Sequence, residues 1–286
     1  MRHFLVMTVK VFLTTLASLA ICSMLPLQAN GQTAPSAQTQ TQATAQTAAT
    51  ESGRKPVLVE LFTSEGCSDC PPAEALALKM EQQPIPGVDL IVLEEHVDYW
   101  NRQGWVDPFS SMEWTDRQRV YVGRVNSSPY SPEMVVDGQS QFVGSNGRAA
   151  QAAIEKAARA PETSVTIASG KMDAKDSEDF TVSVGKLAGN APKDVAEVWL
   201  AVVEDGLHSS VTGGENAGHV LYHAAVLRSL HKIGVAGAKG DAAAFTGEAR
   251  VKFKSNWNRA NLHVVVFVQE KKSLAVLGVA STKVAG

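Results

Sequence analysis

Cysteine, aromatic residues and net charge are all scarce in this sequence. Its 286 residues include three cysteines and 6% aromatic residues, and the formal net charge is −3. Three cysteines are too few for a scaffold held together by disulfides. A slightly acidic chain does not attract phosphates, so we expect no nucleic-acid partner. The hydrophobic fraction of 44% is that of a globular protein, and the length suits one or two domains.

The first 29 residues have the organisation of a secretory signal peptide. The basic residues Arg2 and Lys10 precede an uncharged apolar stretch at 11–21. Leu27–Ala29 then resembles a small-residue cleavage site. The apolar stretch is shorter than the roughly 20 residues of a spanning helix, although an uncleaved anchor is the alternative. We therefore expect residues 1–29 to be removed and the mature protein to be periplasmic or secreted, with no membrane span.

A polar segment follows the signal peptide. Residues 30–54 consist almost entirely of Gln, Thr, Ala and Ser, with charges only at Glu51 and Arg54. Such a segment cannot bury enough apolar surface to offset the entropy lost on ordering. We predict a disordered linker here, with a polar edge strand as the alternative.

Residues 55–161 alternate between short apolar runs and helix-forming segments. The runs at 57–62 and 90–93 are typical of buried parallel strands, and a hairpin is expected at 134–143 around Asp137-Gly138. Helices are expected at 73–82, 113–122 and 147–160. The order strand–helix–strand, helix, strand–strand–helix predicts an α/β thioredoxin-like domain.

Residues 162–286 lack a helical period and contain short apolar runs separated by turn residues. This pattern predicts a mostly antiparallel β-sandwich-like domain. Strands are expected at 165–168, 180–184, 195–203, 219–228, 250–253, 262–269 and 274–279. His219 and His223 would share one face of a strand and could bind a metal, but solvent-facing or hydrogen-bonded histidines are commoner. Trp199 and Trp257 are expected in the core.

The motif that carries chemistry is Cys67-Ser68-Asp69-Cys70, followed by Pro71 between the first strand and the first helix. The partial positive charge of a helix N-terminus stabilises a thiolate at Cys67, and Cys70 is one helical turn away, close enough to form a disulfide. The motif predicts a redox-active dithiol in which Cys67 attacks and Cys70 resolves. A structural disulfide and half of a zinc site are the alternatives, although no second CxxC supplies further ligands.

Two further residues are expected beside the cysteines. In thioredoxin-like folds a cis-proline precedes the third strand and faces the CxxC, and Pro132 stands at that place after Ser131. A trans proline that opens an edge strand is the alternative. His96 follows the second strand, and parallel strands end on one rim, so we expect it near Cys67 as a proton acceptor or metal ligand. A hydrogen bond within its own loop is the alternative role.

Other motifs accompany the CxxC. They comprise Val59–Ala73, His96–Trp100, Gly104–Phe109, Arg117–Arg119, Ser131–Gly138, Gly214–Gly218 and Val226–Arg228. Together these motifs resemble a secreted thioredoxin-like family of bacteria, catalogued as domain of unknown function 1223. The resemblance covers roughly residues 56–286. It implies the thioredoxin-like fold but no established substrate.

Three classes of function fit these residues. The first is a periplasmic or secreted thiol-disulfide oxidoreductase that acts on a protein or small-molecule thiol or disulfide and needs no cofactor. The second is a copper-binding or metallochaperone module that uses Cys67 and Cys70, with His96 as a further ligand, because soft thiolates suit Cu(I). The third is a non-catalytic adaptor with a structural disulfide.

Overall fold

A computed structural model describes residues 47–48, 53–83, 85–173, 176–188, 195–237 and 245–284. The predicted signal peptide at 1–29 and most of the predicted linker at 30–54 lie outside these residues. The chain divides into units at 1–43 and 44–286, and the described helices and strands all belong to the second unit. No helix in the described part of the chain combines the length and apolar character that a membrane crossing requires.

The order of elements predicted between residues 55 and 161 is present. The elements are β2 (Lys55–Thr63), α1 (Pro71–Gln82), β3 (Val88–His96), α2 (Met112–Arg124), β4 (Glu133–Val136), β5 (Ser140–Val143) and α3 (Gly147–Ala157). Prolines occupy the first turn of α1, where a missing N–H costs no hydrogen bond. The side chain of Asn146 caps α3 by accepting a hydrogen bond from the backbone N–H of Ala149 at 3.1 Å. Asp137 and Gly138 both have positive φ, as the predicted hairpin turn requires.

Strands dominate the remainder of the chain. They are β6 (Val165–Met172), β7 (Ser177–Val184), β8 (Ala196–Asp205), β9 (His208–Ser210), β10 (Val220–Tyr222), β11 (Ala225–Ala236), β12 (Phe245–Lys252), β13 (Leu262–Glu270) and β14 (Val276–Lys283), with β1 (Thr47–Ala48) added from the N-terminal side. The predicted strand at 219–228 is in fact two strands, because the chain leaves β10 after Tyr222 and enters β11 at Ala225. His223 lies in the short break between them.

The predicted fold class is wrong. The sequence suggested an α/β thioredoxin-like domain followed by a separate β-sandwich-like domain, but the described part of the chain is mostly β and is organised around one mixed sheet in the order β14-β13-β8-β11-β3-β2-β4-β5. The joining contact is a parallel pairing of β11 with β3, in register at Val226 and Glu94. Apolar runs identify strands but not their partners, so the sequence pattern did not reveal that one sheet crosses the expected boundary.

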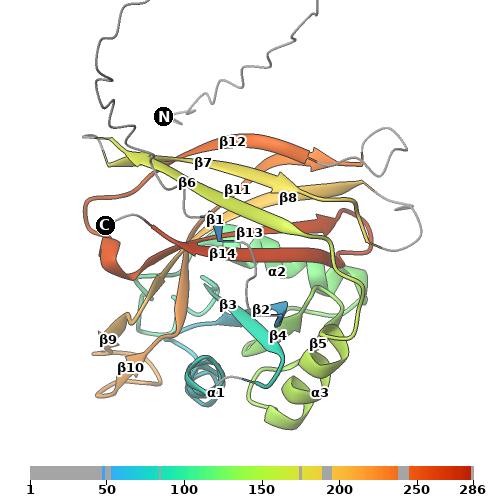
Figure 1. Cartoon of the computed structure of the whole chain (residues 1–286). Helices are drawn as coiled ribbons and strands as arrows, with labels where there is room; N and C mark the ends of the chain where they lie inside the picture. Colours follow the sequence, from blue (N-terminus) through green and yellow to red (C-terminus); the bar gives the residue numbers. More distant parts are fainter. Residues whose placement is uncertain are drawn as a thin grey trace, which may run out of the picture. The chain divides into compact units, whose positions relative to one another are not determined.

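A second, antiparallel sheet has the order β1-β6-β7-β12. Figure 1 shows β6, β7 and β12 as a layer at the end of this unit away from α1 and α3. Buried side chains from this sheet, such as Ile167 and Phe180, share one apolar cluster with Leu200 of β8 and Val266 of β13. Trp257 is buried in the same cluster, as predicted, and Trp199 packs at the edge of the other large cluster.

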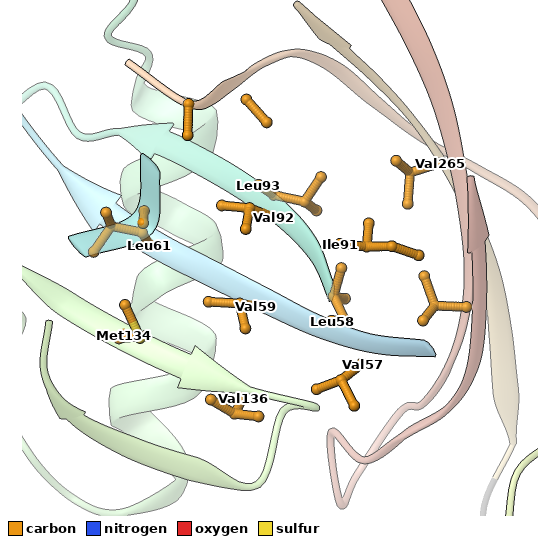
Figure 2. Packing of buried hydrophobic residues seen from close by; sticks show 14 of the residues in the cluster. Val57, Leu58, Val59, Leu61, Ile91, Val92, Leu93, Met134, Val136 and Val265 are labelled. Carbon is orange, nitrogen blue, oxygen red and sulfur yellow. The ribbon is translucent and has the colours of Figure 1, made fainter. Parts of the chain in front are cut away.

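The other large cluster holds the half of the sheet that carries the cysteines. Figure 2 shows side chains of β2, β3 and β4 converging, among them Leu58, Val92 and Met134, with Val265 of β13 beside them. Residues 57–63 of β2 are all buried, which is why this strand reads as a continuous apolar run rather than an alternating one. This packing fixes the C-terminal ends of β2 and β3, where the site lies.

Candidate functional site

The two cysteines lie in the turn between β2 and α1. Cys70 is the N-cap of α1, and its backbone N–H donates to the carbonyl of Cys67 at 3.2 Å. The two thiols are free and buried, with 1% and 0% of the residue surface exposed for Cys67 and Cys70, whereas Ser68 and Asp69 between them are exposed. The dithiol therefore faces inward, and a reaction partner reaches Cys67 only if the surrounding loops move.

The pKa values of the two thiols are shifted in opposite directions. A hydrogen bond from the Cys70 side chain lowers the pKa of Cys67 below its ordinary value, against an opposing effect of burial. Burial and the neighbouring Cys67 raise the pKa of Cys70. Cys67 is therefore the more readily ionised thiol, and Cys70 is the hydrogen-bond donor to it.

This asymmetry predicts the order in which the two cysteines react with an alkylating agent. In the reduced protein at neutral pH, iodoacetamide should modify Cys67 before Cys70, because only the thiolate is nucleophilic. Mass spectrometry of peptides taken at successive times measures the two rates separately. Equal labelling, or labelling of Cys70 first, would contradict the assignment of the attacking cysteine.

The Ser131–Pro132 peptide bond is cis, as predicted. It lies beside the dithiol, because the Sγ of Cys67 is 3.7 Å from the carbonyl oxygen of Ser131. The indole N–H of Trp100 donates to the Ser131 hydroxyl at 2.6 Å, which holds this residue in place. Cys67, Cys70 and Pro132, predicted from the sequence as site residues, are thus together.

A loop from the distant C-terminal part of the chain holds the CxxC turn. The side-chain amide of Asn216 donates to the carbonyls of Glu65 at 2.8 Å and Cys67 at 3.0 Å. The neighbouring Glu215 accepts a hydrogen bond from the backbone N–H of Ser68 at 3.0 Å. Only the resemblance drew attention to this Gly-Glu-Asn segment, and nothing in its local pattern indicates a contact with the CxxC.

Close backbone contacts explain the two glycines before this segment. A Cβ on Gly213 would lie 2.3 Å from the carbonyl oxygen of Gly104, and Gly214 has a φ of +72°. Side chains at these positions would push the loop away or strain it. The Gly213-Gly214 pair thus lets the loop lie directly on the segment that carries Trp105.

Replacing Asn216 by alanine should destabilise the protein. Asn216 is buried, and the substitution removes two hydrogen bonds to buried carbonyls, so we expect the free energy of unfolding to fall by about 1–3 kcal/mol. Urea denaturation measures the change. The control is Asn256→Ala at an exposed position, expected to change stability by less than about 0.5 kcal/mol. Equal stability of the two variants would show that the Asn216 amide does not hold the turn.

His96 is at the end of β3, in register with Thr63 at the end of β2. It is fully buried, and its Nδ1 is 2.7 Å from a carboxylate oxygen of Asp107. Burial alone would lower the pKa of His96, but the charge and hydrogen bond of Asp107 outweigh it and raise the pKa to about 9. The same oxygen of Asp107 accepts the backbone N–H of Glu65 at 2.8 Å, so this pair is tied to the CxxC turn.

A second buried histidine faces His96. His223 lies between β10 and β11 with its Nε2 3.0 Å from Glu65, and its ring centre is 4.8 Å from that of His96. The indole of Trp105 donates to the other oxygen of Glu65 at 2.8 Å. The sequence placed His223 on one strand face with His219; this was wrong, because the strand ends at Tyr222 and His219 is exposed.

Further buried carboxylates complete the surroundings. Glu74 of α1 accepts a hydrogen bond from Thr63 at 2.6 Å, and Glu94 of β3 accepts the backbone N–H of Ala224 at 3.0 Å. Within the described ranges, the group of side chains that could jointly hold a metal ion is Glu94, His96 and His223. It contains His96 but neither Cys67 nor Cys70, so the structure does not bring together the thiolate and histidine ligands considered from the sequence.

Fold and site define a β-rich protein with an inward-facing dithiol beside a buried carboxylate–histidine cluster. The chain belongs to the family described as "Protein of unknown function (DUF1223)", whose model matches residues 58–269. The match confirms the assignment to domain of unknown function 1223 that the sequence motifs suggested. No curated protein matches the chain.

Two solved structures share the fold. An X-ray crystal structure of an Agrobacterium tumefaciens protein from a structural genomics programme is 23% identical, with a TM-score of 0.56, and the match covers 82% of this chain and 98% of that one. HBP35 of Porphyromonas gingivalis is 15% identical, with a TM-score of 0.57 over 82% of this chain and 76% of that one. At these identities the likeness concerns the fold alone.

Proposed function

We propose that this protein is a thiol-disulfide oxidoreductase whose redox couple is Cys67 and Cys70. The observation that supports this proposal best is the placement of two free thiols one helical turn apart at the start of α1, with the Cys67 sulfur against the Ser131 carbonyl at 3.7 Å. A structural disulfide would need no difference in acidity between its two sulfurs. Here the pKa of the first thiol is lowered and that of the second is raised, which suits attack followed by resolution.

The exchange proceeds in two steps. The Cys67 thiolate attacks one sulfur of a substrate disulfide, forming a mixed disulfide and releasing the first substrate thiolate. Cys70 then loses its proton and attacks the Cys67 sulfur, which forms the Cys67–Cys70 disulfide and releases the second substrate thiolate. The substrate gains two electrons and the dithiol loses two, so an external thiol must regenerate the protein. No cofactor takes part.

The partner is a protein or small-molecule thiol or disulfide in an oxidising compartment. Export by the N-terminal segment at 1–29 would deliver the protein to the periplasm or the exterior, where such couples operate. Cys67 is 1% exposed, so a substrate must displace part of the surrounding chain to reach it.

The test is reduction of insulin disulfides with dithiothreitol as the external thiol. The wild-type protein should accelerate precipitation of the insulin chains, and Cys67→Ser should give the rate of dithiothreitol alone. Ser255→Ala is the control; Ser255 is exposed and lies outside the CxxC turn, so this variant should keep the wild-type rate. If the wild-type protein is no faster than dithiothreitol, or Cys67→Ser is as fast as wild type, the proposal fails.

A further inference from the structure

His96 and His223 are both held in the way that metal-binding histidines are held. One ring nitrogen of each faces a buried carboxylate: Nδ1 of His96 at 2.7 Å from Asp107, and Nε2 of His223 at 3.0 Å from Glu65. The other nitrogen of each, Nε2 of His96 and Nδ1 of His223, is buried and has no hydrogen-bond partner in the part of the chain that the structure describes. A carboxylate behind each imidazole fixes the ring and strengthens the opposite nitrogen as a ligand.

A carboxylate side chain joins the two imidazoles at this place. Ligand atoms of Glu94, His96 and His223 all lie within 4.8 Å of one another, and none of the three side chains is exposed. The Oε1 of Glu94 has no hydrogen-bond partner among the described residues either. Each of the three side chains thus carries a buried polar atom without a hydrogen-bond partner, which is costly unless something binds it.

The charges of the cluster favour a cation. Four carboxylates, of Glu65, Glu74, Glu94 and Asp107, surround the two imidazoles, and none is more than 2% exposed. In the described ranges their ion pairs are with His96 and His223, and none is with a lysine or arginine. At most two positive charges on the imidazoles face these four carboxyl groups in a site with almost no access to water, and a bound cation would balance the carboxyl groups further.

We propose that Glu94, His96 and His223 bind a divalent first-row transition metal such as Zn(II). Two imidazole nitrogens with one carboxylate form a ligand set that zinc takes in proteins, whereas Mg(II) and Ca(II) prefer oxygen ligands alone and Cu(I) prefers sulfur. The Oε2 of Glu74, 3.7 Å from Nδ1 of His223, is a further oxygen placed for a fourth position. This site is separate from the dithiol and does not depend on the proposed exchange reaction.

The test uses the full chain carrying Cys67→Ser and Cys70→Ser together, so that no thiolate at the CxxC can bind the metal. After treatment with a chelator, this variant should bind one equivalent of Zn(II) by calorimetry. With Co(II) it should show the visible absorption of a four-coordinate site without thiolate-to-cobalt charge transfer. Zn(II) should also raise its melting temperature, since a ligand that binds only the folded state stabilises it.

Variants of the cluster locate the metal. In the same background, Glu94→Gln and His223→Ala should each weaken Zn(II) binding at least about tenfold, and His219→Ala, at an exposed histidine, should not. If His223→Ala does not fold, Glu94→Gln decides, because its amide oxygen can still accept the N–H of Ala224. Absence of Zn(II) binding without the cysteines, or wild-type affinity in Glu94→Gln, overturns the proposal and leaves the proposed thiol exchange untouched.

Discussion

Incubated with oxidised glutathione, the Cys70→Ser variant should retain one glutathione in a stable mixed disulfide on Cys67. In the wild-type protein the Cys70 thiol attacks that mixed disulfide and releases the glutathione, leaving an internal disulfide. The serine hydroxyl is not nucleophilic enough to do the same, so the adduct accumulates. Intact-mass spectrometry without reductant measures the adduct directly.

The reciprocal variant is the matched control. Cys67→Ser keeps Cys70, whose pKa burial raises, and should gain little or no glutathione under the same conditions. Peptide mapping of the Cys70→Ser adduct should place the glutathione on Cys67. Rapid modification of Cys67→Ser together with an unmodified Cys70→Ser would reverse the two roles.

Replacing Arg117 by alanine should lower the free energy of unfolding by about 3–5 kcal/mol, because it leaves buried carboxylates without their cation. Arg117 of α2 pairs with Glu60 of β2 and lies 3.4 Å from Glu95 of β3; its side chain is 11% exposed and those of the two glutamates 1% and 0%. It also donates to the hydroxyl of Tyr121 at 3.1 Å. Urea denaturation measures the loss.

The loss should also depend on pH. Burial, and then the neighbouring Glu60, already raise the pKa of Glu95 well above its ordinary value, and Arg117 opposes this rise. Without Arg117 the pKa of Glu95 rises further, so the folded variant holds this proton to higher pH than the unfolded one and its stability falls as the pH rises above about 4.3. We expect a larger deficit at pH 8 than at pH 5.

Arg119 provides the control for Arg117. It lies on the same helix, pairs at 2.6 Å with Asp116, and both side chains are 58% exposed. Arg119→Ala should change stability by less than about 0.5 kcal/mol at either pH. Similar effects of the two substitutions would mean that the buried ion pair contributes no more than a surface one.

The local part of the site was predictable from the sequence, because it depends on neighbours in the chain. Pro71 and Pro72 open α1, so the CxxC before them had to lie at a helix N-terminus. His96 ends one of two parallel strands, which put it on the same rim as the turn that carries Cys67. The cis bond before Pro132 was predicted by comparison with thioredoxin-like folds, in which a cis-proline precedes this strand.

The rest of the site depends on contacts between distant segments, which local patterns do not encode. Buried Glu94 lies where β11 pairs with β3 in register at Val226, a pairing between two segments that the sequence patterns separated. His223 looked like a strand residue and instead lies in a break, where it faces His96. The sequence feature that came closest to indicating this cluster was acidic Glu94, directly after the apolar run that predicted a buried strand.

The reduction potential of the Cys67–Cys70 couple tests the central claim most directly. The full chain would be equilibrated in glutathione buffers of defined potential, with the dithiol and disulfide forms quantified after acid quenching and alkylation. We expect a reversible two-electron transition between about −270 and −120 mV, the range of dithiols that exchange with substrates. A potential below about −300 mV, typical of structural disulfides, or no internal disulfide in any buffer, would contradict the account.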